Sequence, residues 1–187
     1  MAEDPAERDR CVDIICAKVD QLDGMVDDLI DFVRMDTAEW RRHLETVKLA
    51  PFLQSLIRRT RADAELLERR VESALEIPEG LSAPMDERLA QRALENIVNN
   101  ALRYTDPGGL VRVAARTEPG RAVVTIADDG PGIAREDLPR VFDLFYRGTP
   151  SRREGGLGLG LAIVRGVADS HGWEVRVRSE PGKGSGI

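Results

Sequence analysis

The sequence is poor in cysteine and in uninterrupted apolar runs. Its two cysteines, Cys11 and Cys16, lie five apart in a helical pattern, on different faces, which argues against a disulfide framework and against a zinc site. No apolar run approaches the roughly 18 residues of a membrane span, and the opening MAEDPAERDR lacks the apolar core of a secretory signal. We therefore expect reduced thiols and a cytoplasmic location, with any membrane contact made only through a region upstream.

An excess of positive charge is also missing. The 187 residues include 33 acidic and 27 basic side chains, for a formal net charge of -6. General attraction to nucleic acid or to anionic lipid is thus not the expected mode of action, and a polyanionic ligand would need local cations or a metal. The 42% hydrophobic content suits one ordinary soluble domain with an appendage.

Residues 1–45 have the heptad pattern of an amphipathic helix. The apolar seam consists of Val12, Ile15, Val19, Leu22, Val26, Leu29 and Val33. Apolar residues beside the seam make the stripe wider than that of a two-stranded coiled coil, so it suits a coiled-coil-like helix of a four-helix bundle. A long helix folded back onto its own globular domain is the alternative.

After residue 45, strands and helices alternate without regular βαβ spacing. We expect a strand at 46–49, a helix opened by Pro51, a strand at 70–75, a helix from Asp86 to about residue 104, and half-exposed antiparallel strands at 111–115, 121–127 and 173–178. The segment IPEGLSAP is rich in turn residues. This order predicts an α+β fold, a two-layer sandwich spanning 46–187, rather than a doubly wound sheet.

Polar side chains lie among apolar ones on the helix at 86–104. Asn96, Asn100 and Arg103 share one face, and an amide oxygen is a suitable ligand for Mg²⁺, which also holds phosphates; a solvated asparagine face is the alternative. The segment DDGPGI places two carboxylates before glycines that let a flat ligand approach the backbone. In GGLGLGL, glycines alternate with leucines ahead of a helix, which suggests close approach of a phosphate-bearing ligand.

Taken in order, four segments resemble the N, G1, F and G2 boxes of the catalytic ATP-binding domain of sensor histidine kinases. They are ENIVNNALRYT (95–105), DDGPGI (128–133), RVFDLFYRG (140–148) and GGLGLGLAIV (155–164). The resemblance implies the Bergerat fold of the gyrase, Hsp90 and MutL ATPases, with ATP and Mg²⁺ as cofactors. MVDDLIDFVRMD resembles the second helix of the dimerisation and histidine-phosphotransfer region, which implies a homodimer through the helical bundle of the full-length protein and a response regulator receiver domain as partner.

The resemblance also implies roles for individual residues. Asp128 matches the aspartate that hydrogen-bonds the adenine amino group, and Asn100 matches the asparagine that coordinates Mg²⁺. The matches to neighbours that line the metal, phosphate and base regions are Asn96, Arg103 and Tyr104, and the turn under the adenine contains Gly130, Gly132 and Ile133. The remaining nucleotide-binding candidates, from a mobile lid and the glycine box, are Phe145, Arg147, Arg152, Arg153, Gly156, Leu157, Gly158, Leu159, Gly160 and Leu161.

Within the lid, Phe142 and Phe145 are expected to anchor the two ends. The lid arginines offer charge to the phosphates, and solvated loop charge is an equally open interpretation for any one of them. The glycines of the last box would provide the hinge of the lid and a helix N-terminus, where backbone N–H groups receive phosphates.

Departures from the family pattern bear on the chemistry. In the ATPases of this fold a glutamate that activates water lies four residues before the metal asparagine; here that residue is Asn96, and Glu95 faces about 100 degrees away on an ideal helix. Transfer to another acceptor is therefore favoured over hydrolysis. The sequence context of His43 does not match an acceptor histidine, and His171 is interpreted as structural, so we expect a kinase fragment that binds ATP but does not phosphorylate itself.

Two alternatives to a histidine kinase stay open. One is a nucleotide-binding regulatory module, such as a degenerate kinase that acts as a scaffold. Whether the purified chain binds Mg-ATP is the observation that bears on it. The other is a serine kinase of the anti-sigma type on the same fold, against which the heptad helix at 1–45 argues.

Overall fold

The structure is a computed structural model that describes residues 43–148 and 157–187, together with residues 12, 15, 16, 19, 26 and 30. The helix expected at 1–45 thus lies mostly outside the described residues. The six residues described there are helical and exposed, and they include the seam residues Val12, Ile15, Val19 and Val26.

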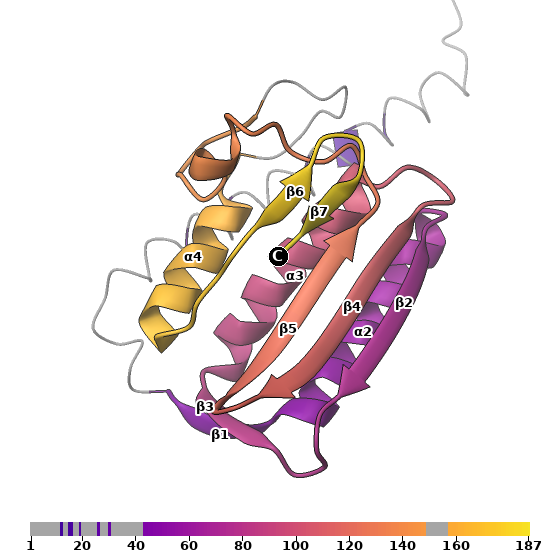
Figure 1. Ribbon diagram of the computed structural model, residues 1–187. Coiled ribbons are helices and arrows are strands. Elements are labelled where there is room, and N and C mark those ends of the chain that lie inside the picture. The colour runs from indigo at the N-terminus through magenta and orange to yellow at the C-terminus, as the bar shows by residue number, and fades with distance from the viewer. Residues whose placement is uncertain are drawn as a thin grey trace, which may run out of the picture.

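A five-stranded sheet with helices on one face forms the two expected layers (Figure 1). In spatial order the strands are β2 (Arg70–Glu76), β4 (Leu110–Glu118), β5 (Arg121–Asp128), β7 (Gly184–Gly186) and β6 (Arg178–Glu180). Strand β2 runs parallel to β4, and the other neighbours are antiparallel. The α+β two-layer prediction is confirmed.

The helices are α2 (Leu49–Leu66), α3 (Glu87–Tyr104) and α4 (Gly160–His171), with a short 3-10 helix η2 at Leu138–Arg140. A separate two-stranded sheet pairs β1 (Glu45–Lys48) with β3 (Ser82–Met85). Pro51 lies in the first turn of α2, as expected, where its missing N–H costs no hydrogen bond.

The core fills the space between the helices and the sheet. On β4, Val111 and Val113 are fully buried and flank the exposed Arg112, which is the alternation of a strand with one covered face. Helix α3 buries apolar residues at helical spacing, namely Leu89, Ala90, Ala93, Ile97, Val98, Ala101 and Leu102. Helices α2 and α4 contribute Leu53 and Leu56, and Ile163 and Val167.

The start of α3 is fixed by two side chains. The Asp86 carboxylate accepts a hydrogen bond from the Leu89 N–H at 3.1 Å, so Asp86 is the expected N-cap. The Asp86 N–H donates to His171 Nε2 at 3.1 Å, while His171 Nδ1 lies 2.8 Å from the Val167 carbonyl and must donate to it. His171 is thus a neutral ring that joins α3 to the last turn of α4, which confirms its structural interpretation.

Strands near the C-terminus differ from the sequence prediction. Of the expected strand at 173–178 only Arg178 lies in a strand, the first residue of β6, and residues 173–177 pair with no strand among the described residues; β5 pairs with β7 there through Ala127 and Asp128. Val175 and Val177 are half-buried between exposed neighbours, as the alternation predicts, but Trp173 is 38% exposed. Strand β3 lies, except for Met85, within the stretch expected to be turns, and the sequence Gly-Ser-Gly of β7 carries no apolar alternation that could have predicted it.

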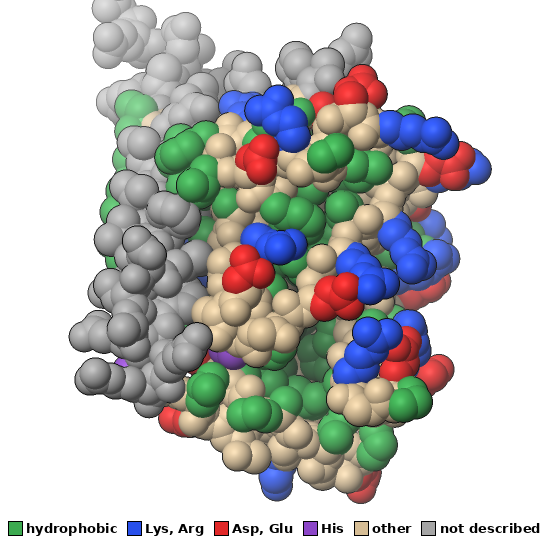
Figure 2. Space-filling model, turned by 60° about the vertical axis from the view of Figure 1, so that its left-hand side comes forward, with side chains coloured by type: hydrophobic (Ala, Val, Ile, Leu, Met, Phe, Trp, Pro, Cys, Tyr) green, Lys and Arg blue, Asp and Glu red, His purple; other side chains and the backbone are tan. Residues whose placement is uncertain are grey.

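The outer surface mixes both signs of charge. Arginine and glutamate form ion pairs there: Arg112 of β4 lies 3.1 Å from Glu72 of the neighbouring β2, and Arg121 of β5 lies 3.7 Å from Glu174, which is in no strand. Figure 2, which turns the α4 side of the molecule forward, shows acidic and basic side chains intermixed with apolar ones. Within residues 43–148 and 157–187, and at the six described positions before them, no helix is long and apolar enough to cross a bilayer.

Candidate functional site

A cavity of about 460 Å³ opens between the C-terminal half of α3, the end of β5 and the N-terminus of α4. This volume lies in the range of small-molecule sites, which is roughly 300–1,000 Å³. The predicted site residues that line it are Asn100, Arg103, Tyr104, Asp128, Gly132, Ile133, Arg147, Gly158, Gly160 and Leu161. Residues from four separate sequence segments therefore meet at one place.

Strand pairing determines the end of the cavity around Asp128. This residue ends β5, and the β5–β7 register places it opposite Ser185. The Gly130 N–H donates to Asp128 Oδ1 at 2.9 Å, and the Ser185 N–H donates to the same carboxyl group. Burial raises the pKa of the Asp128 carboxyl; the two backbone hydrogen bonds oppose that rise, and the charge of Asp129 adds to it. The result is a half-buried, well-oriented hydrogen-bond acceptor.

The turn after β5 depends on two glycines. A Cβ on Gly130 would lie 2.8 Å from both Asp128 Oδ1 and the Tyr104 carbonyl oxygen, so no side chain fits there. Gly132 has φ of 71° and packs directly against the Glu180 carbonyl, a conformation and a contact that exclude a side chain. Gly130 is buried beneath the turn, whereas Gly132 lines the cavity.

Helix α3 supplies the polar groups at the other end. Asn100 and Arg103 line the cavity, while Asn96 lies one turn earlier beside the N-terminus of α4. A Cβ on Gly160 would lie 3.3 Å from Asn96 Oδ1. Asn96 Nδ2 is buried and has no hydrogen-bond partner within the described part of the chain. Such an amide retains its capacity to donate to a ligand or to water.

Glu95 points away from this face, as the helical spacing predicts. Its Oε1 accepts a hydrogen bond from Gln91 Nε2 at 2.9 Å and forms an ion pair with Arg59 Nε of α2 at 3.2 Å. Glu95 therefore contacts α2 rather than the cavity.

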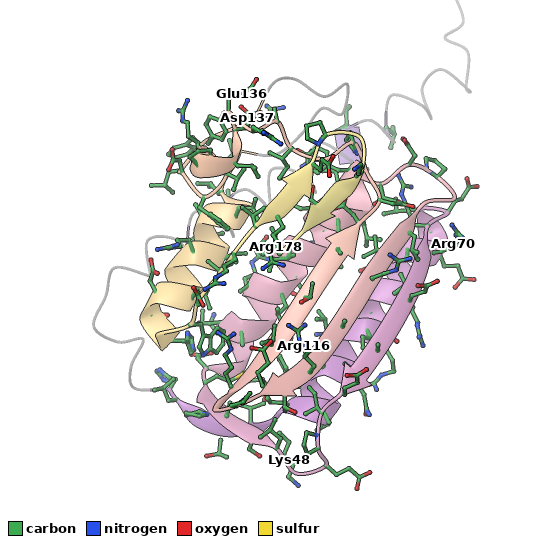
Figure 3. All side chains as sticks on the ribbon, viewed as in Figure 1. Lys48, Arg70, Arg116, Glu136, Asp137 and Arg178 are labelled. Atoms are coloured by element: carbon green, nitrogen blue, oxygen red, sulfur yellow. The ribbon has the colours of Figure 1, made fainter. Side chains whose placement is uncertain are left out.

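Residues around η2 and after it close the remaining side. The Tyr146 hydroxyl donates to Asp137 Oδ1 at 2.7 Å, and this hydrogen bond raises the pKa of Tyr146. The Arg140 guanidinium lies 4.2 Å from the centre of the Tyr146 ring. Figure 3 labels Asp137 and its neighbour Glu136 beside η2, at the end of the molecule where α4 begins. Gly158 has φ of 72°, and a Cβ at this position would lie 2.5 Å from the Tyr146 carbonyl oxygen, so a side chain does not fit there.

Several predicted residues lie elsewhere. Leu159 is 1% exposed and packs in the core at the start of α4, and Leu157 is 39% exposed at the surface. The Phe145 side chain is 60% exposed, so it does not anchor its segment by packing, and Phe142 is half-buried. The predictions for Arg152, Arg153 and Gly156 lie outside the described residues.

Sequence reasoning missed three polar residues of the cavity lining. Asp137, Tyr146 and Ser185 all line it. Tyr146 lies in the quoted segment RVFDLFYRG, so that segment was recognised but not this side chain, whereas Asp137 and Ser185 lie outside the four quoted segments.

Metal ligands of the usual clustered kind are absent from the described residues. No group of three or more His, Cys, Asp or Glu side chains there could hold a metal ion. A Mg²⁺ ion, which keeps several waters and binds phosphate oxygens, needs only one or two protein oxygens, and the amide oxygen of Asn100 is one that the cavity offers.

Residues 85–187 match the model of the histidine kinase-, DNA gyrase B-, and HSP90-like ATPase family. The sensor-like histidine kinase SenX3 of Mycobacterium tuberculosis (strain ATCC 25618 / H37Rv) is 35% identical over 186 residues, which are 98% of this chain and 45% of SenX3. The chain therefore spans less than half the length of this relative.

Solved structures of histidine kinases are also similar to this chain. The mycobacterial sensor histidine kinase MprB is 31% identical with a TM-score of 0.65, over 77% of this chain and 93% of that one. Full-length ShkA, solved in complex with AMPPNP, is 27% identical with a TM-score of 0.79, over 99% of this chain and 38% of that one.

Proposed function

Since this chain belongs to the histidine kinase-, DNA gyrase B-, and HSP90-like ATPase family, we propose that its cavity binds Mg-ATP as the catalytic domain of a two-component sensor histidine kinase. The observation that carries the proposal is the presence of Asp128 and Asn100 in one cavity, an oriented carboxyl acceptor together with an amide suited to magnesium. We assign residues 46–187 to this domain and residues 1–45 to the dimerisation region.

At the base end, Asp128 accepts a hydrogen bond from the adenine amino group. Its carboxyl group is held by two backbone N–H groups and is therefore oriented before the ligand arrives. Gly132 and Ile133 let the flat ring approach the backbone, and Tyr104 borders the same space. The ShkA complex with the ATP analogue AMPPNP supports this use of the cavity.

At the phosphate end, Asn100 would hold Mg²⁺, and Arg103 and Arg147 supply positive charge. When bound, the metal neutralises phosphate oxygens. The α4 N-terminus, with Gly158 and Gly160, presents backbone N–H groups, and Asn96 places beside it an amide that no described residue pairs with. With Glu95 engaged by Arg59, no carboxylate of α3 is aimed at water here, which favours phosphoryl transfer over hydrolysis.

The acceptor is a histidine of another segment of the full-length protein. Both ring nitrogens of His171 are engaged in structural hydrogen bonds, and His43 lies outside any acceptor motif. From that histidine the phosphoryl group passes to the aspartate of a response regulator. The histidine kinase ThkA, which shares this fold at 18% identity and a TM-score of 0.74, was solved in complex with the response regulator TrrA, and this supports the choice of partner.

In the full-length protein we place this domain on the cytoplasmic side and assign dimerisation to the helix at 1–45. Its described seam residues Val12, Ile15 and Val19 are exposed, as an unpaired bundle helix requires.

Calorimetric titration with a non-hydrolysable ATP analogue, with and without Mg²⁺, tests the binding step. We expect magnesium-dependent binding, and we expect ADP to bind the same site. Absence of binding under both conditions would contradict the proposed function.

Incubation with radiolabelled ATP tests the transfer step. The chain alone should take up almost no label, whereas addition of a helical hairpin that carries an acceptor histidine should give an acid-labile phosphohistidine that can pass to a receiver domain. Strong label on the chain alone that His43→Ala abolishes would contradict the assignment of the acceptor.

A further inference from the structure

Ser179 of β6 lies behind the cavity wall and does not line the cavity itself. Its half-buried hydroxyl nevertheless joins three segments. Ser179 Oγ accepts the Ile133 N–H at 2.7 Å, lies 2.8 Å from the Gly184 carbonyl oxygen, and lies 3.0 Å from Ser185 Oγ. This one hydroxyl therefore connects the turn under the proposed base site to the strand that carries Ser185.

The protons in this cluster can be assigned by counting donors. A carbonyl oxygen has no proton, so the 2.8 Å contact requires the Ser179 hydroxyl to donate to Gly184. A hydroxyl has only one proton, so the contact between the two serines must be a donation from Ser185 to Ser179. The Ser179 hydroxyl then donates one hydrogen bond, to Gly184, and accepts two, from Ile133 and Ser185. The Ser185 oxygen can therefore only accept hydrogen bonds from a ligand in the cavity.

Ser185 and Asp128 lie opposite each other in the β5–β7 register, and both line the cavity. The ionised carboxylate is purely an acceptor, and with its proton committed to Ser179 the Ser185 hydroxyl is also an acceptor on this side. Two acceptors side by side attract an amino group and repel a carbonyl oxygen. The 6-amino group of adenine fits this pair, and the 6-oxo group of hypoxanthine or guanine does not.

We propose that Ser179 is a positioning residue that favours 6-amino over 6-oxo purine nucleotides by holding the Ser185 hydroxyl as an acceptor. The inference rests on the proposed nucleotide-binding function and adds to it the residue that sets base preference from outside the cavity. When Ser179 loses its hydroxyl, Ser185 is free to turn its proton toward the ligand. A 6-oxo group then gains a hydrogen-bond donor. The ratio of the affinities for 6-amino and 6-oxo nucleotides therefore falls, even where the affinity for the 6-amino nucleotide changes little.

The test compares ADP with IDP by calorimetric titration; their bases carry a 6-amino and a 6-oxo group, and the 6-oxo base also carries a proton at N1. In Ser179→Ala the preference for ADP should fall by about tenfold, a change of about 1.4 kcal/mol in relative binding free energy. Ser179→Thr keeps the hydroxyl in a strand-favouring residue and should restore the preference. Ser73→Ala is the matched control: it makes the same chemical change on β2, where Ser73 accepts a hydrogen bond from Arg61 at an exposed position. It should leave the ratio of ADP to IDP affinity unchanged.

A double-mutant cycle keeps the test decisive if Ser179→Ala folds poorly. Ser185→Ala should also narrow the preference, and adding Ser179→Ala to it should narrow it no further, because the two serines act through one hydroxyl. Equal loss of ADP and IDP affinity in Ser179→Ala, or additive effects of the two changes, would overturn the role of Ser179 while leaving the proposed function intact. Failure of the unaltered chain to bind either nucleotide would overturn both.

Discussion

The two ends of helix α3 differ in how their polar side chains are hydrogen-bonded. At its start, Asp86 caps the Leu89 N–H, and His171 accepts the Asp86 N–H, so the polar groups there are paired within the protein. Toward its end, Asn96 keeps a buried amide with no partner among the described residues, and Asn100 faces the cavity. One helix thus contains a start whose polar groups are paired and, toward its end, a buried Asn96 amide that no described residue pairs with.

The contrast separates stability from function along a single element. Residues at the capped end are expected to matter for folding and hardly at all for ligand affinity, and residues at the cavity end the reverse. Each of the following changes tests one side of this division.

The largest effect is expected from Asp86→Ala combined with His171→Ala. Loss of the cap costs about 1 kcal/mol, and loss of the His171 acceptor and its packing against Trp173 costs at least as much, so the free energy of unfolding should fall by about 2 kcal/mol. Urea denaturation measures the loss. Nucleotide affinity of the folded protein should be unchanged. A drop in nucleotide affinity without a drop in stability would contradict the assignment of the capped end to folding.

Next in size is Asn100→Ala, at the cavity end. Removing the proposed magnesium ligand should weaken binding of the Mg-nucleotide at least about tenfold, or about 1.4 kcal/mol, with little change in melting temperature. Asn99→Ala is the matched control, since Asn99 is the exposed neighbour on the same helix and does not line this cavity. Equal effects of the two changes on titration would argue against a specific role for Asn100.

A smaller effect is expected from Gly160→Ala, which reaches the same end from α4. The added Cβ would lie 3.3 Å from Asn96 Oδ1, so the amide must shift by a few tenths of an ångström. Triphosphate binding should weaken by about threefold while adenosine binding holds, because the change lies at the phosphate end. Parallel titrations with the two ligands distinguish this outcome from a general loss of fold, in which both would weaken.

The smallest effect concerns stability against pH in Asp128→Asn. Burial raises the folded-state pKa of this carboxyl above the unfolded value of about 3.9. The stability that this titration contributes is therefore fully present below the unfolded pKa and is lost as the pH rises through the folded pKa. Two backbone hydrogen bonds oppose the burial and keep the effect small.

The asparagine variant has no such titration, so its stability relative to the unaltered protein should increase as the pH rises through that window. Denaturation curves at a series of pH values measure the difference. A relative stability that falls over the same window would mean that the carboxylate is favoured in the fold.

Local rules were enough to predict the capped end of α3. The Asp86 cap, the apolar spacing that follows it and the burial of Val111 and Val113 depend on residues close in sequence, and the structure confirms them. The C-terminal strands could not be predicted in the same way. Residues 173–177 have the alternation of a strand, but pairing depends on whether a neighbour extends alongside them, and β7 is too short to do so.

The candidate site divides similarly. The quoted boxes supplied Asn100 and Asp128 because their side chains lie within recognisable segments. The hydrogen bond from Tyr146 to Asp137 and the proton assignment at Ser179 and Ser185 depend on folding that brings separate turns and strands together, which residue spacing does not encode.

The parallel pairing of β2 with β4 has a consequence for the order of folding. Strands β4 and β5 are joined by a tight turn at Pro119 and Gly120, so they pair through contacts that are local in sequence. Strands β2 and β4 are separated in the sequence by β3 and α3, so their pairing requires a longer loop to close. Strand β7 then joins β5 through its last residues. We therefore expect the β4–β5 hairpin to form early and the Ser185 side of the cavity to form late, so that the base site is completed only when the chain has otherwise finished folding.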